Sequence, residues 1–153
     1  MNFKVVIDAG HGGEDAGAIN GNVYEKDLTL QIAKYMYDQF QKKGIPVTII
    51  RNTDETVSPE ERVRRILNAY GNNSDVVVIS NHINAGGGEG AEVIYALRNN
   101  SNLASNVLTA LGNKGLKMRK YYQRRLPSDT SKDYYFIHRN TGKTEPIIVE
   151  YGF

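Results

Sequence analysis

Three short apolar runs in the chain are each followed closely by a residue that can bind a metal ion or transfer a proton. The runs cover residues 5–7, 76–79 and 147–149, and the residues that follow them are His11, His82 and Glu150. Runs of β-branched residues bounded by Gly, Asn and Asp predict buried strands. Because ligands of an open α/β sheet gather beyond the carboxyl ends of its strands, we expect these three side chains to be neighbours in space.

Apolar residues at helical spacing predict helices between the strands. The first helix covers about residues 24–43 and ends at Gly44. Its apolar residues recur at intervals of four and are Leu28, Ile32, Met36 and Phe40. The second helix begins at Ser58 with the sequence Ser-Pro-Glu-Glu, a capping box with Pro at the first helical position. A third helix is expected from about residue 103 to 112.

The order of these elements predicts the fold class. Further strands are expected at residues 47–51, 91–97 and 134–137, whereas residues 117–133 show no sustained period and predict a mobile loop. Strands and helices alternate, which is typical of an α/β protein. We expect a single domain over residues 1–153, with a mostly parallel, twisted central sheet and helices on both faces.

Composition narrows the class of protein. Hydrophobic residues make up 40% of the chain, and no apolar stretch approaches the roughly 20 residues that cross a bilayer, so we expect no membrane span. A net charge of +2 gives no reason to expect a nucleic-acid partner. The basic segment at residues 119–125 either attracts an anionic polymer locally or is a solvated surface. Because the chain has no Cys, a metal ion would need His and carboxylate ligands.

Two histidines and an early glutamate form a candidate metal site. Glu25 lies in the first turn of the helix entered from the first strand, which places it at the same sheet edge as His11 and His82. Two imidazoles and one carboxylate suit a hydrolytic zinc site, where the metal activates water at neutral pH and polarises a carbonyl. Glu150 is the candidate for taking a proton from that water and passing it to a leaving amine.

Each of these residues also has a purely structural interpretation. Glu25 alone could close a capping box begun at Asn22. The two histidines could be polar strand ends satisfied by backbone groups, and Glu150 could be a buried salt-bridge partner. The joint placement at one sheet edge favours the metal site. The third histidine, His138, is expected at the protein surface.

The glycines around the first histidine have a competing interpretation as a phosphate-binding loop, because glycines after a strand can cradle phosphate against the next helix. The spacing argues against it. About ten further residues separate Gly13 from the helix, and two of them, Glu14 and Asp15, would repel phosphate.

Taken together, the ordered motifs resemble the catalytic domain of the zinc-dependent N-acetylmuramoyl-L-alanine amidases of the third amidase family, which occurs in bacterial autolysins, sporulation lysins and phage endolysins. The motifs that carry the resemblance are residues 7–13, Glu25, Arg51, residues 61–68, residues 80–84, residues 90–93 and residues 149–153. They extend over essentially the whole chain, and their order makes the set specific although each motif alone is weak.

The resemblance implies one zinc ion bound by His11, Glu25 and His82, with Glu150 as the catalytic carboxylate. It also implies hydrolysis of the amide between the lactyl group of N-acetylmuramic acid and the first L-alanine of the stem peptide. Bacterial peptidoglycan is then the expected partner, and the protein is expected to act on the cell wall as a monomer. Asn84, on the loop that carries His82, is the expected substrate contact.

The chain departs from the family pattern at its end, where the pattern normally continues past Phe153 into another helix. We therefore expect a truncated sequence. The N-terminus carries no secretory segment, which favours synthesis in the cytoplasm as a phage endolysin or a sporulation lysin. The alternative function from another class is a non-catalytic peptidoglycan-binding module of the same fold.

Overall fold

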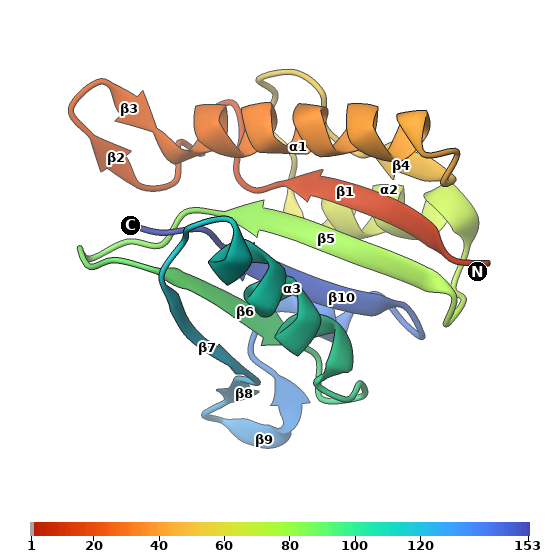
Figure 1. Ribbon diagram of the computed structural model, residues 1–153. Helices are drawn as coiled ribbons and strands as arrows, with labels where there is room; N and C mark the ends of the chain where they lie inside the picture. Colours follow the sequence, from red (N-terminus) through yellow and green to blue (C-terminus); the bar gives the residue numbers. More distant parts are fainter. Residues whose placement is uncertain (1) are drawn as a thin grey trace.

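A six-stranded sheet runs through the centre of the computed structural model, which describes residues 2–153 (Figure 1). In spatial order its strands are β4 (Val47–Ile49), β1 (Lys4–Ala9), β5 (Val76–His82), β10 (Glu145–Glu150), β6 (Ala91–Tyr95) and β7 (Met118–Tyr122). All neighbouring pairs are parallel except β10 with β6. The prediction of a mostly parallel α/β sheet is confirmed.

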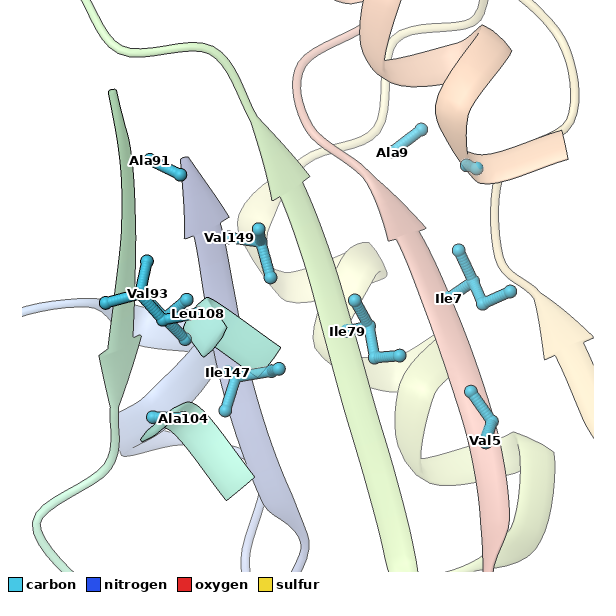
Figure 2. Close-up of a cluster of buried hydrophobic side chains, with 11 residues drawn as sticks. Val5, Ile7, Ala9, Ile79, Ala91, Val93, Ala104, Leu108, Ile147 and Val149 are labelled. Atoms are coloured by element: carbon cyan, nitrogen blue, oxygen red, sulfur yellow. The ribbon is translucent and has the colours of Figure 1, made fainter. Parts of the chain in front are cut away.

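Helices cover both faces of this sheet, as expected. One face carries α1 (Glu25–Lys42) and α3 (Asn102–Asn113), and the other carries α2 (Pro59–Tyr70) and the short α4 (Phe136–Arg139). Figure 2 shows the cluster under α1 and α3, in which Ile147 of β10 lies near Leu108 of α3, and Ile7 of β1 lies farther along the same face of the sheet. Ile66 of α2 lies in the second cluster, on the opposite face. Within the described residues, none of these helices is long and apolar enough to cross a membrane.

The helix boundaries follow from local chemistry. The hydroxyl of Ser58 accepts a hydrogen bond from the Glu61 amide at 3.1 Å, so the predicted cap of α2 is confirmed, with Pro59 at the first helical position. The chain leaves α1 at Gly44, whose φ of 71° lies in the left-handed region that glycine adopts without strain.

Two small hairpins lie outside the central sheet. One joins β2 (Ile19–Asn20) to β3 (Val23–Tyr24) before α1, and the other joins β8 (Arg125–Leu126) to β9 (Asp129–Asp133). Together β7, β8 and β9 occupy the segment predicted to be a mobile loop, so that prediction is wrong. The side chains of residues 118–121 on β7 are all exposed, and an edge strand of this kind lacks the apolar alternation that marks a half-buried strand.

The prediction of a short strand at residues 134–137 is also wrong, because α4 begins at Phe136. A helix of four residues is too short to show a helical period, so its apolar residues looked like those of a strand.

His138 is buried rather than at the surface, which corrects the third expectation for this region. Its side chain is 0% exposed and stacks edge-on against Tyr135. Within residues 2–153 neither ring nitrogen has a hydrogen-bond partner of good geometry, although the Ile94 backbone lies close by. Burial, with a smaller contribution from the charge of Arg98, lowers the pKa of His138 to about 3.

We expect His138→Phe to flatten the acid side of the stability profile. Between pH 6.5 and about 3 the unfolded chain binds a proton at this histidine that the folded chain does not bind, so stability falls as the pH falls. One proton corresponds to a slope of at most about 1.4 kcal/mol per pH unit. Urea unfolding over this pH range measures the slope. Tyr35→Phe, a control at an exposed position of α1, should keep the slope of the original protein, and equal slopes in all three proteins would contradict the prediction.

Candidate metal centre and active site

The parallel strands bring the predicted site residues to one edge of the sheet. His11 lies two residues beyond the end of β1, while His82 and Glu150 are the last residues of β5 and β10. In the sheet register Glu150 is the direct partner of His82, and Asn81 is the partner of Ala9. The carboxyl ends of three adjacent strands therefore meet at the site.

Glu25 reaches this edge from the first turn of α1. Its side chain is 5% exposed and is held by two backbone amides, from Ala18 to Oε1 at 2.9 Å and from Ile83 to Oε2 at 3.0 Å. Oε2 lies 3.1 Å from Nε2 of His11 and 3.2 Å from Nδ1 of His82. The residue before it, Tyr24, is the helix cap and makes no side-chain cap bond, so the alternative of a capping box with Asn22 is not observed.

The three side chains form a group that can hold a metal ion. One ligand atom from each of His11, Glu25 and His82 lies within 4.8 Å of the other two. Two imidazole nitrogens and a carboxylate oxygen, with one side left open, fit a four-coordinate catalytic zinc ion. Burial opposes ionisation of Glu25, but the hydrogen bonds from both histidines and from the two amides outweigh it, and they hold the pKa of this carboxyl well below its usual range. Glu25 is therefore a carboxylate at neutral pH, as a ligand must be.

Asp15 orients the first histidine. Its Oδ2 lies 2.8 Å from Nδ1 of His11, which leaves Nε2 directed at Glu25. A carboxylate on the other ring nitrogen is the usual support of a metal-binding histidine. Sequence reasoning treated Asp15 only as a group that repels phosphate, although its place four residues after a candidate ligand in the same loop was a usable signal.

Two buried arginines hold the backbone of the same loop. Arg62 of α2 pairs with Asp8, and it also donates to the carbonyls of Ala9 at 2.8 Å and His11 at 2.9 Å. Arg51 donates to the carbonyls of Ala9 and Gly10. Both positions belonged to recognised motifs, but the sequence offered no means of telling a buried arginine from a solvated one.

Glu150 faces a cavity that it shares with both histidines. The cavity has a volume of about 170 Å³, and Phe136 and Ile148 contribute apolar walls. Within the described residues, Oε2 of Glu150 is buried without a hydrogen-bond partner. Burial raises the pKa of this carboxyl. The alternative of a buried salt-bridge partner is not observed, because no ion pair involves Glu150 in residues 2–153.

Asn84 lies in a different hollow. This second, open hollow of about 500 Å³ is lined by Glu25 and Ile83 together with the β2–β3 hairpin. The side-chain amide of Asn84 donates to the buried carboxylate of Glu92 at 3.1 Å, and its backbone amide donates to the carbonyl of Gly152 at 2.6 Å. The structure therefore places Asn84 in the hollow that Glu25 lines, whereas Glu150 lines a different cavity.

A His-Glu-His cluster at the carboxyl ends of parallel strands is typical of a metal-dependent hydrolase. The family can be stated more closely. A model of the N-acetylmuramoyl-L-alanine amidase family (Amidase_3) matches residues 5–153, and the chain belongs to that family.

Individual relatives are similar over part of their length. The chain is 35% identical to the uncharacterized protein YqiI of Bacillus subtilis over 113 residues, which are 70% of this chain and 53% of that protein. It is 33% identical over 91 residues to a germination-specific N-acetylmuramoyl-L-alanine amidase of the same organism, covering 53% of this chain and 38% of the relative. The chain thus spans about half or less of the length of these relatives.

Solved structures extend the similarity to nearly the whole fold. Cwp6 from Clostridium difficile superposes with a TM-score of 0.86 at 32% identity, covering 98% of this chain and 24% of that one. The catalytic domain of CwlV, an N-acetylmuramoyl-L-alanine amidase from Bacillus (Paenibacillus) polymyxa, gives a TM-score of 0.76 at 26% identity, with 97% and 79% of the two chains covered.

We expect Gly17→Ala to damage the metal site and Gly21→Ala to leave it intact. Both glycines have left-handed φ values, 69° and 61°, so both substitutions carry similar backbone strain. A Cβ at Gly17 would lie 2.7 Å from both Oε1 of Glu25 and Cδ2 of His11, whereas a Cβ at Gly21 meets nothing within 4 Å. Titration with zinc against a chromophoric chelator should show at least a tenfold loss of affinity for Gly17→Ala alone, on the scale of a disturbed ligand support. Equal affinities in the two variants would contradict this account.

Proposed function

We propose that this chain hydrolyses the amide between the lactyl group of N-acetylmuramic acid and the L-alanine of the stem peptide, using one zinc ion held by His11, Glu25 and His82. The observation that carries the proposal is the convergence of these three ligand atoms within 4.8 Å of one another, beside a cavity that Glu150 shares with both histidines. Family membership supplies the substrate class.

Glu150 is the residue we assign to proton transfer. When bound, zinc supplies Lewis acidity toward the carbonyl and lowers the pKa of water toward neutrality. Glu150 accepts a proton from the attacking water and delivers it to the alanine nitrogen as the C–N bond breaks and the new C–O bond forms. The products are a lactyl carboxylic acid and a peptide with a free amino terminus. The raised pKa of Glu150 suits a group that must both accept and donate a proton.

Asn84 is proposed to contact the substrate in the open hollow that Glu25 also lines. The carboxylate of Glu92 accepts one N–H of its side-chain amide and the oxygen accepts from the Ala85 amide at 3.2 Å, which leaves the second N–H for substrate. A group held in this way loses little conformational entropy when it binds.

The contacts at the site argue against a phosphate-binding loop and against a non-catalytic binding module. In the glycine loop, the amide of Gly13 already donates to Asp54 at 2.8 Å, and the amide of Glu14 donates to Thr56 at 2.9 Å. These are donors that a phosphate cradle would need free. A non-catalytic binding module would have no use for an unpartnered buried carboxylate beside a set of metal ligands.

We further propose that residues 1–153 act as one catalytic domain and that the protein works in the cell-wall space. Two apolar clusters on opposite faces of one sheet support a single folding unit, and the family match covers nearly all of it. Peptidoglycan is the substrate class of the family, which supports a reaction in the cell-wall space.

Glu150→Gln should keep zinc and lose turnover. Glutamine is nearly isosteric but cannot accept the proton of water, and loss of a general base costs about 10²- to 10⁴-fold in rate. Release of new alanine amino termini from purified sacculi measures activity, and elemental analysis measures bound metal.

Glu25→Gln is the matched control, since it should lose metal and activity together. Chelation should abolish turnover of the original protein, and added zinc should restore it. Full activity of Glu150→Gln would remove this residue from the mechanism.

A further inference from the structure

The positive charge of the chain is concentrated in one segment. Residues 114–133 contain seven Lys and Arg and two Asp, whereas the rest of the chain contains twelve Lys and Arg and fifteen Asp and Glu. This segment forms the edge strand β7 and the β8–β9 hairpin, which lie together at one border of the sheet in Figure 1. All seven basic side chains are exposed. A strongly positive surface therefore borders a domain that is otherwise acidic.

Two of these cations are positioned without being neutralised. The ammonium group of Lys120 lies 4.4 Å from the ring centre of Tyr122, and the guanidinium of Arg124 lies 3.8 Å from that of Tyr134. Arg124 also donates to the hydroxyl of Tyr135 at 3.3 Å. In the described residues neither cation pairs with a carboxylate, although Arg119 and Lys132 of the same segment do. Aromatic faces orient a cation while leaving it free to bind an anion.

The sheet register connects these cations to the candidate active site. His82 is the strand partner of Glu150, Glu150 is the partner of Glu92, and Glu92 is the partner of Lys120. These four residues form one row across four strands, so Lys120 lies about 10 Å from Glu150 at two strand spacings.

The carboxylate of Glu92, which lies between them in this row, forms its ion pair with Arg119 and not with Lys120. It lies 3.4 Å from Arg119 and accepts hydrogen bonds from Asn84 and Tyr122. Arg124 is connected to the site through a different residue. Its hydrogen-bond partner Tyr135 lines the cavity that contains His11 and Glu150.

We propose that Lys120 and Arg124 form an anion-binding site for carboxylate groups of the stem peptide. The proposal rests on the proposed function and extends it to the recognition of the leaving group. The peptide released by this reaction is anionic wherever its side-chain and terminal carboxylates are free. Since Glu150 protonates the amine of that peptide, the peptide must lie on the Glu150 side of the metal ligands, which is the side where the two cations lie.

A structural explanation competes with this one. Lysine and arginine on an edge strand prevent edge-to-edge pairing between molecules. That role predicts that neutral variants associate or aggregate, and it predicts no dependence on the charge of the substrate.

The test compares two soluble muramoyl peptides, one with free carboxylates and one with the same carboxylates converted to primary amides. The double variant Lys120→Gln/Arg124→Gln should raise the KM for the free-carboxylate substrate about tenfold, as expected for loss of charge-assisted hydrogen bonds worth about 1.4 kcal/mol. Its kcat should stay near that of the original protein, and its KM for the amidated substrate should not change. Lys114→Gln, a neutralised exposed lysine of the same segment outside the row, is the matched control and should change neither KM.

Three other outcomes would contradict the proposed anion-binding site. Equal losses on both substrates would show a packing role, and self-association of the double variant with unchanged KM would show edge protection. An effect confined to sacculi that still carry phosphate polymers would assign the cations to those polymers.

Binding separates this proposal from the proposed function. Calorimetric titration with the free peptide product needs no turnover, and the double variant should bind it about tenfold more weakly than the original protein. If the original protein shows no amidase activity but the double variant still binds the product more weakly, the anion site is supported and the proposed function is contradicted. If the original protein is active and both proteins bind the product equally well, only the anion site is contradicted.

Discussion

Two buried guanidinium groups fix the loop that carries the first histidine, and the geometry of the site depends on them. His11 has a φ of 66°, the one non-glycine residue with a positive φ in residues 2–153. A left-handed conformation of this kind costs about 1 kcal/mol or more and persists only where the surroundings enforce it. Arg62 binds the carbonyl of His11 itself, and with Arg51 it binds the carbonyls of the preceding residues. The loop is thereby held in a conformation that directs the imidazole toward Glu25.

The same arginines join the loop to the two faces of the sheet. Arg62 comes from α2 and pairs with Asp8, whose other oxygen accepts a hydrogen bond from Ser80 of β5 at 2.7 Å. Removing one partner of a buried pair costs about 3–5 kcal/mol, because a charge is then left without compensation. The hydrophobic clusters supply most of the driving force for folding, but they do not determine where a loop places an imidazole. That specificity comes from charged groups whose hydrogen bonds have only one satisfactory arrangement.

The elements that sequence reasoning located correctly are those whose local pattern agrees with their tertiary environment. The apolar runs of β1, β5 and β10 are buried on both faces, and the cap of α2 is made by its own residues, so each could be recognised from a few neighbours. The edge strand β7 and the four-residue α4 could not, because one is solvated along most of its length and the other is shorter than two helical turns. His138 shows the same limit. Its helix α4 packs against α2 and β10 from elsewhere in the chain, and no local pattern records those contacts.

The part of the site that lies at the carboxyl ends of the strands could be predicted from the sequence. Parallel neighbours bring their carboxyl ends together, so His11, His82 and Glu150 converge once the strand order is known, and a helix entered from β1 returns Glu25 to the same edge. The residues that sequence reasoning missed act across the sheet or within the loop, as Glu92 and Asp15 do.

Their placement gives the site two unlike sides. Glu25 lines an open hollow that also contains Asn84, whereas Glu150 lines a separate, smaller cavity with His11 and His82. With the peptide held by Lys120 and Arg124 as proposed, an amide with a neutral glycan on one side and an anionic peptide on the other binds productively in only one direction. In the proposed mechanism, that direction places the nitrogen of the scissile bond next to Glu150.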